Sequence, residues 1–228
     1  MIDQYYILLV IPAMIFALWA QFKVKSTFSK YSSAVCSSGL TGREAAEYIL
    51  RTNSITDVSV QKVAGELTDN YNPSTSTVSL SDPVYDRASV AAIGVAAHEC
   101  GHVIQHSVGY LPMKIRSAII PATNIGSTLS WPLILIGLVL GWYKLALIGV
   151  IAFSLTAVFQ LITLPVEFDA SRRALLVLGE SGRLTEEELK GVKKVLTAAA
   201  LTYVAALSVS IAQLLRLLAI VGGGRRRR

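Results

Sequence analysis

The stretch SVAAIGVAAHECGHVIQHS, residues 89–107, decides how the central part of this chain folds. It is rich in Ala and Val, it opens on a helix-capping serine, and Gly109 and Pro112 follow it, so it predicts one helix from Ser89 to about Ser107. The apolar portion at residues 90–97 is too short to cross a bilayer and has no flanking anchors. We therefore expect a helix that is buried inside a folded part of the chain.

The same helix contains His98-Glu99-Cys100-Gly101-His102, which matches the pattern H-E-x-x-H. Four residues along a helix advance about 6 Å and about 40°, so one metal ion can bridge the imidazoles of His98 and His102. Glu99 lies at the edge of this site and can take a proton from water without binding the metal. The alternative is a core helix whose polar side chains make ordinary hydrogen bonds. All three histidines of the chain lie within nine residues, which favours a zinc site with Glu99 as general base.

A catalytic zinc usually has three protein ligands and leaves the fourth position to water. His106 lies about 12 Å from His98 along an unbroken helix, so we expect it to support a ligand or to pack instead. Glu167 is the preferred third ligand, because Pro165 is expected to open a new helix, Val166 to about Leu178, on the same side of the membrane. Four other carboxylates remain alternatives in surroundings that indicate a solvated turn and helix start: Glu180, Glu186, Glu187 and Glu188.

Asp169 and the two arginines that follow it are candidates for supporting roles. Asp169 is expected on the opposite side of the helix from Glu167, as a first-turn or ion-pair residue. Arg172 or Arg173 could stabilise an oxyanion, pair with Asp169, or anchor the chain near the membrane. We assign neither arginine a catalytic role.

The composition points to a bilayer. Hydrophobic residues make up 53% of the 228 residues and charged residues 16%, against about 45–50% and about 25% in soluble domains. Four runs are close to the roughly 20 residues that one span needs: Tyr5–Phe22, Ser117–Leu140, Lys144–Leu164 and Leu196–Val221. The first lacks the basic start and cleavage site of a signal peptide, so we interpret it as a retained anchor.

Basic residues near the spans predict the orientation, because basic loops stay cytoplasmic. They gather after the first span, before the second, and between the third and fourth. Residues 23–116 and 166–195 are therefore predicted to be cytoplasmic. Four crossings would place the basic tail Arg225–Arg228 outside, where basic residues are disfavoured. Either the last run does not cross the membrane, or the tail departs from the rule, or the sequence GGGRRRR was appended to the protein.

Short elements fill the region between the first two spans. Thr41 and Glu44 form a capping box for a helix to about Thr52, and Thr185 with Glu188 forms another. Asp57–Val63 and Thr75–Ser81 are predicted strands on either side of a turn at residues 69–73. The strand at Thr77–Leu80 either binds a peptide by strand addition or is an ordinary edge strand.

Charge and cysteine content narrow the classes of partner. The net charge of +6 comes partly from the tail, and the basic residues flank spans without forming an aromatic-interleaved patch, which argues against nucleic acid. Anionic lipid headgroups are the expected contact. Cys36 and Cys100 are too few for a disulfide framework, so we expect free thiols in a reducing compartment. Partners are a protein or peptide substrate and the bilayer, with a homo-oligomer or another membrane protein left open.

Two segments resemble the YugP-like neutral zinc metallopeptidases of bacterial membranes: NYNPSTSTVSLSDPVYDRASVAAIGVAAHECGHVIQH and LPVEFDASRRAL. The resemblance covers nearly the whole chain. More distantly, Glu167–Ala170 is similar to the E-F-x-A element of HtpX-type and CAAX-prenyl membrane proteases, which implies that Glu167 binds zinc. Those relatives usually have an aspartate where this chain has Ser171, so their contact from that position to a ligand is in doubt here.

Residues and resemblance together predict a zinc-dependent membrane endopeptidase with one Zn²⁺ per chain, in which Glu99 deprotonates a water and later protonates the leaving amine. The fold class is a mainly α membrane protein with about four transmembrane helices and a small α+β zincin-like cytosolic portion. The expected parts are an N-terminal transmembrane helix (1–22), the cytosolic zincin-like part (23–116), a transmembrane hairpin (117–165), a cytosolic helix with the third ligand (166–195), a C-terminal apolar helix (196–221) and a basic tail (222–228). The alternatives are a scaffold with a structural zinc and a site-2-type intramembrane protease.

Overall fold

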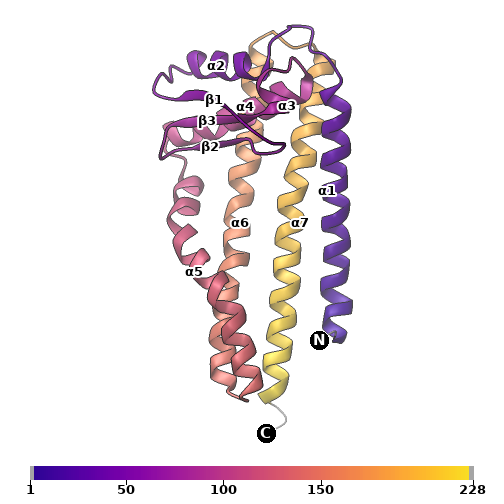
Figure 1. The fold of residues 1–228 in the computed structure, drawn as a ribbon, viewed down its shortest axis with the longest axis vertical. Coiled ribbons are helices and arrows are strands. Elements are labelled where there is room, and N and C mark those ends of the chain that lie inside the picture. The colour runs from indigo at the N-terminus through magenta and orange to yellow at the C-terminus, as the bar shows by residue number, and fades with distance from the viewer. Residues whose placement is uncertain (1–2, 226–228) are drawn as a thin grey trace. The chain divides into compact units, whose positions relative to one another are not determined.

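The computed structural model describes residues 3–225, and helices dominate it (Figure 1). The chain divides into two compact units. The helical unit consists of the chain up to Gln21, Lys114–Leu164, and the chain from Leu201 onward. The sheet unit consists of Phe22–Met113 and Pro165–Ala200. Of the predicted basic tail, residues 226–228 lie outside the described residues.

Within residues 3–225, four helices are long and apolar enough to cross a membrane. They are the π-helical turn Tyr6–Val10 with α1 (Ile11–Ser32), then α5 (Leu111–Val139), α6 (Tyr143–Glu180) and α7 (Glu186–Arg225). Large apolar side chains such as Leu8, Leu135 and Ile148 are exposed along them. Because apolar surface on this scale is unfavourable in water, it indicates an apolar surrounding. The predicted helical fold class with four candidate spans is confirmed.

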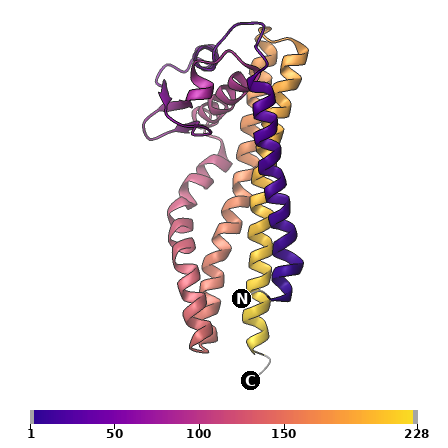
Figure 2. The same cartoon turned by 45° about the vertical axis from the view of Figure 1, so that its right-hand side comes forward.

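Helices α5 and α6 form a hairpin through a short turn in which Gly141 has a φ of 64° (Figure 2). Glycines bring the two helices together. A Cβ at Gly137 would clash with the backbone of Ala146, and a Cβ at Gly149 would lie 2.8 Å from the carbonyl oxygen of Ser130. Small residues of this kind let helices associate by van der Waals contact in lipid, where the hydrophobic effect between helices is absent.

Arg216, the charged residue inside the fourth candidate span, has partners. Nε of Arg216 donates to Oδ2 of Asp3 at 2.8 Å, and its guanidinium lies 5.0 Å from the centre of the Tyr6 ring. An ionised side chain in a membrane helix is costly unless it is paired. The ion pair and the aromatic face therefore explain how the apolar part of α7 contains a cation.

Capping residues begin the helices of the sheet unit where the sequence predicts. Ahead of α2 (Gly42–Thr52), Oγ1 of Thr41 accepts from the backbone N–H of Glu44, and the Glu44 carboxylate accepts from the N–H of Thr41. Thr185 and Glu188 make the same reciprocal pair ahead of α7. These patterns could be predicted because each cap involves residues only three positions apart.

Helix α4 (Val90–Ser107) is the buried helix that the sequence predicts. It begins after Ser89, whose hydroxyl accepts from the N–H of Ala92 at 3.2 Å. Most of its residues are buried, and Ile93 and Val103 lie in the main core with residues of α2 and of the short helix α3 (Asp82–Tyr85). The two cysteines are buried free thiols.

The sheet has three strands, β1 (Ser59–Val63), β2 (Asn70–Asn72) and β3 (Thr77–Ser81), in the order β1-β3-β2. β3 pairs with β1 in parallel and with β2 antiparallel. The segment predicted as a turn at residues 69–73 thus contains a strand. The prediction that Thr77–Leu80 is an edge strand is wrong, because β3 is central and buried along its whole length. The free edges belong to β1 and β2.

Helix α6 corrects a second prediction. We expected Pro165 to open a new helix, but α6 continues through Pro165 to Glu180. A proline inside a helix loses one backbone hydrogen bond, which neighbouring helices and side-chain hydroxyls can compensate in membrane proteins. Glu167 therefore lies in the interior of a long helix instead of in its first turn.

Helices α4 and α6 approach each other closely beside the candidate site. A Cβ built at Gly101 would lie 2.5 Å from the carbonyl oxygen of Ala170. Both residues lie in the sheet unit, Gly101 between the two motif histidines and Ala170 three residues after Glu167. Glycine at position 101 is thus required by space, and it lets residues from the two helices meet.

We predict that Gly101→Ala lowers the melting temperature of the purified, metal-free protein in detergent, because the added methyl group forces the two backbones apart at a cost of about 1–3 kcal/mol. Gly179→Ala in α6 is the matched control, since its Cβ would meet only Leu189 Cδ2 at 3.5 Å, an ordinary contact. A Gly101→Ala protein that melts with the wild type would contradict the close approach.

Candidate metal centre

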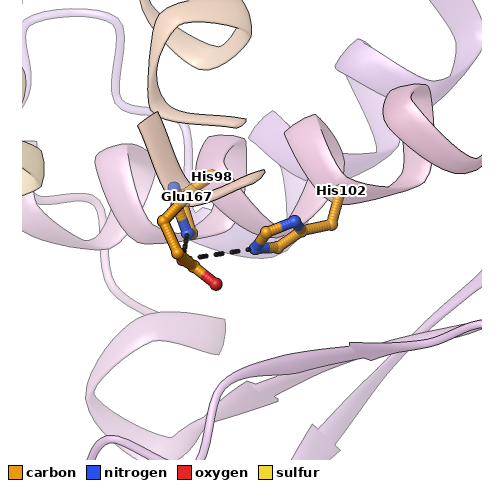
Figure 3. Close-up of side chains that lie close together, drawn as sticks. All are labelled: His98, His102 and Glu167. Carbon is orange, nitrogen blue, oxygen red and sulfur yellow. Dashed lines mark hydrogen bonds and ion pairs between the residues drawn. The ribbon is translucent and has the colours of Figure 1, made fainter. Parts of the chain in front are cut away.

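His98, His102 and Glu167 bring their side chains to one point (Figure 3). The two histidines lie one helical turn apart on α4, with ring centroids 4.8 Å apart and nearly perpendicular planes. Oε2 of Glu167, from α6, lies 3.2 Å from Nε2 of His98 and 3.7 Å from Nε2 of His102. His102 and Glu167 are buried and His98 is partly exposed. The structure therefore brings together the three residues that the sequence proposes as ligands.

The spacing and the chemistry of this group fit a zinc ion. Ligand atoms about 2.0–2.1 Å from a tetrahedral zinc lie roughly 3.3 Å from one another. The distances of 3.2 and 3.7 Å to Oε2 of Glu167 are close to that value. Two imidazoles and one glutamate form the ligand set of known catalytic zinc sites with an open fourth position. The distances and the residue types of the group are therefore those of a possible metal site.

Both histidines have a hydrogen-bond partner on the ring nitrogen that faces away from Glu167. The hydroxyl of Ser171 lies 3.2 Å from Nδ1 of His98, and Oε1 of Gln105 lies 3.0 Å from Nδ1 of His102. Such partners orient an imidazole and fix which nitrogen can bind a metal. The contact that the sequence put in doubt at Ser171 is present, with a hydroxyl in place of a carboxylate.

Gln105 is the functional candidate that the sequence analysis missed. It follows His102 by three residues, the spacing that places two side chains on one helix face. That spacing was the available signal. What the sequence could not reveal is that Gln105 is fully buried and that its other partners come from α6.

The charges of the three candidate ligands affect the pKa of Glu99. It is buried, and burial raises the pKa of its carboxyl above the ordinary value. His98 and His102 oppose this rise in pKa, whereas the carboxylates of Glu167 and Asp69 add to it. A raised pKa brings a carboxyl closer to neutral pH, where it can both accept and return a proton.

His102 responds to the same two carboxylates. Burial alone would lower the pKa of His102, but the carboxylate of Glu167, 3.7 Å from its Nε2, and the charge of Glu99 raise the pKa above the ordinary value. In the metal-free protein the two carboxylates therefore stabilise the positively charged form of His102. Since a metal binds the neutral imidazole, metal and proton compete for His102.

His106 lies apart from the group, in agreement with the prediction that it is not a ligand. It is exposed, and its Nδ1 lies 3.2 Å from the hydroxyl of Tyr71 in β2. The rings are tilted, with centroids 5.9 Å apart. His106 thus helps to place β2 along α4.

The alternative carboxylates are occupied elsewhere or exposed. Glu188 accepts hydrogen bonds from Ser37 and caps α7, and Glu187 pairs with Lys190. Glu180 and Glu186 are exposed. Within residues 3–225, the side chains that could hold a metal ion together are His98, His102 and Glu167, and none of these four carboxylates belongs to that group.

Asp169 lies between two arginines, as one of the predicted alternatives has it. Arg172 donates to Oδ1 and Arg173 to Oδ2 of its carboxylate. The expectation that Asp169 points away from the Glu167 side is wrong in one respect, because Oδ2 also accepts from Gln105 of α4 at 3.0 Å. The close approach of α4 at Gly101 lets its side chains reach both residues of α6.

Comparison with known proteins identifies the class to which this fold and ligand group belong. The family described as "Putative neutral zinc metallopeptidase" matches residues 6–222, so the chain belongs to that family. The resemblance predicted from the sequence is confirmed. The chain is similar to the protein named "Putative membrane protease YugP" of Bacillus subtilis (strain 168), with 49% identity over 220 residues that cover 96% of this chain and 98% of that protein. No solved structure matches the chain.

We predict that Glu99→Gln raises the melting temperature of the metal-free protein by a few degrees at about pH 8. Because the pKa of Glu99 is raised in the folded state, the proton's contribution to stability is lost as the pH rises through that pKa, and a buried charge remains. The neutral amide avoids this cost. The difference between the two proteins should shrink as the pH falls toward the ordinary pKa of a glutamic acid, because the folded wild type regains its proton before that pH is reached. Thermal melts of both proteins, after chelation and across this pH range, make the comparison. A lower melting temperature for Glu99→Gln at the alkaline end would contradict the stated environment of Glu99.

Proposed function

We propose that the chain is a zinc-dependent membrane endopeptidase, with one Zn²⁺ held by His98, His102 and Glu167 and with Glu99 as general base. The observation that carries this proposal is the convergence of three ligand atoms beside a buried carboxyl whose pKa is raised. Membership of a family described as neutral zinc metallopeptidases supports it, as does the name of the relative, a membrane protease.

The proposed chemistry divides between the ion and the side chains. A zinc ion supplies Lewis-acid chemistry: it polarises a carbonyl group and makes a water molecule more acidic. Glu99 accepts a proton from the attacking water and donates it to the nitrogen of the leaving amine, so one carboxyl serves as base and then as acid. Its raised pKa makes the carboxylate a stronger base for the first half of this cycle.

Strand β2 is the better candidate for holding an extended peptide. It lies at an edge of the sheet, and Tyr71 joins it to α4 through His106. A peptide added to this edge would gain main-chain hydrogen bonds that do not depend on its sequence. We propose β2 in place of β3, whose two sides are paired.

We further propose that the sheet unit is zincin-like and lies on the cytoplasmic side of a bacterial cell membrane, and that the helical unit anchors the chain. Basic residues next to the apolar runs support this orientation, among them Lys23, Lys25, Lys114 and Arg116. Helix α4 has 18 residues and is not among the candidate spans, which disfavours a site-2-type arrangement with the motif inside the membrane.

A structural zinc is the remaining alternative. Structural sites are usually closed by four protein ligands, commonly Cys and His. Among the described residues, the group at the site has three members, and its histidines and glutamate match the catalytic pattern. The buried Cys100 hydrogen-bonds to the carbonyl of Ala46 in α2. These observations favour an open site.

We predict that Glu99→Gln retains stoichiometric zinc but loses about 10²–10⁴-fold in kcat toward casein or a model peptide, because proton transfer to and from the amide is lost. Glu186→Gln, an equivalent change at an exposed position, should leave both quantities unchanged. Zinc is measured by elemental analysis of the purified detergent-solubilised protein. Wild-type turnover by Glu99→Gln would refute the assigned base.

Glu167→Ala should weaken zinc binding more than the roughly 10–100-fold expected for a residue that only supports a ligand. The reason is that one of three ligand atoms is removed. Competition against a chromophoric chelator gives the affinity. Unchanged affinity would assign the third ligand to another residue.

A further inference from the structure

Gln105 is a fully buried polar side chain, and each of its hydrogen-bonding groups has a partner. Its Oε1 lies 3.0 Å from Nδ1 of His102. Its Nε2 lies 2.8 Å from the carbonyl oxygen of Val166 and 3.0 Å from Oδ2 of Asp169. Buried polar groups that lack partners are costly, so a satisfied set of this kind holds the side chain in one orientation.

The partners on α6 decide which way the amide of Gln105 faces. A backbone carbonyl oxygen can only accept a hydrogen bond, and an ionised carboxylate can only accept. The atom that faces Val166 and Asp169 must therefore be the NH₂ group, which has two hydrogens for these two acceptors. The carbonyl oxygen of the amide is left to face His102.

The orientation of the amide in turn decides the tautomer of His102. Because Oε1 of Gln105 can only accept, Nδ1 of His102 must carry the hydrogen. In the neutral ring, Nε2 then has a free lone pair, and this is the nitrogen that faces Glu167. The geometry thus leaves the nitrogen at the candidate metal position ready to bind.

Two arginines bind Asp169, the last residue in the series of hydrogen bonds that begins at His102. Arg172 and Arg173 both donate to Asp169, which keeps the carboxylate ionised and facing Gln105. The guanidinium of Arg173 also lies 5.8 Å from the centre of the Tyr110 ring, which limits its motion. The sequence analysis gave these arginines no catalytic role, and here they act on the site through Asp169.

His98 is held differently. Its partner is the hydroxyl of Ser171, which can donate or accept by rotation of its hydrogen. This contact therefore orients the ring of His98 without selecting a tautomer. In the metal-free protein Nε2 of His98 lies 3.2 Å from Oε2 of Glu167, which can only accept, so this pair favours the Nε2–H form at His98. His102 is the histidine whose partner favours the Nδ1–H form.

We propose that Gln105 and Asp169 are positioning residues that hold His102 in the Nδ1–H tautomer and so fix Nε2 as its metal-binding atom. The part that concerns zinc rests on the proposed function. The tautomer itself does not, because it is a property of the metal-free protein.

The first test measures the tautomer in the full-length wild-type protein. The chain has three histidines, so selective ¹⁵N-histidine labelling gives few imidazole signals, which His98→Ala and His106→Ala variants assign. In metal-free protein at a pH where the rings are neutral, we expect a protonated Nδ1 and an unprotonated Nε2 at His102. A protonated Nε2, or fast exchange between both forms, would overturn the proposal.

The same measurement on Gln105→Met should show a mixture of tautomers at His102. Methionine is similar in size and has no hydrogen-bonding amide, Asp169 keeps both arginines, and the Val166 carbonyl is inside α6, so the fold should persist. An unchanged His102 spectrum in this variant would overturn the role of Gln105.

The second test is a double-mutant cycle on zinc affinity, measured with Zn²⁺ alone against a chromophoric chelator. Gln105→Met should weaken binding by about 10–100-fold, and Asp169→Asn by a smaller factor. Because Asp169 acts through Gln105, Asp169→Asn should have no further effect in the Gln105→Met background. Additive losses, or affinities equal to that of the wild type, would contradict the proposal.

A buried residue beside the site provides the control for general destabilisation. Val103→Ala should lower the melting temperature, because Val103 lies in the main core, and should leave the zinc affinity unchanged. Peptide cleavage and the double-mutant cycle test the proposed peptidase activity and the proposed positioning role separately. Failure of peptide cleavage with an intact cycle would count against the peptidase alone, and cleavage with a failed cycle would count against the positioning residues alone.

Discussion

Helices α4 and α6 touch at Gly101, where the backbone of one helix lies against the backbone of the other, and each residue of the candidate metal centre depends on this contact. α4 supplies His98, Glu99 and His102, and α6 supplies Glu167. A larger residue at position 101 would separate the helices, and the ligand atoms would no longer meet within the distances that one ion spans. The metal centre therefore depends on helix packing, because the two histidines of α4 form a complete ligand group only where α6 supplies the carboxylate of Glu167.

The residues around the ligands also depend on contacts between α4 and α6. Ser171 and Asp169 reach the two histidines from α6, the first directly and the second through Gln105. Both are polar side chains that would be costly to bury alone, and both are satisfied by partners on the opposite helix or by arginine. Glu99 differs, since burial raises the pKa of its carboxyl. The site thus combines well-satisfied residues that fix geometry with one carboxyl whose environment costs stability and suits proton transfer.

Sequence reasoning succeeded where the determining interactions are local. The capping boxes at Thr41 and Thr185, the buried helix with its motif, and the four apolar helices follow from spacing and hydropathy alone. It failed where distant residues decide: Asn70–Asn72 has the composition of a turn and becomes a strand because β3 pairs with it. Likewise α6 passes through Pro165, and Gln105 finds partners more than 60 residues away. These outcomes are set by tertiary packing, which no local pattern encodes.

Anomalous scattering at the zinc absorption edge, from crystals of the full-length wild-type protein loaded with one equivalent of Zn²⁺, tests the central claim most directly. The account predicts a single strong peak within about 2.0–2.2 Å of Nε2 of His98, Nε2 of His102 and a carboxylate oxygen of Glu167, with the fourth position left to solvent. A peak elsewhere in the chain, or an ion enclosed by four protein side chains, would contradict it.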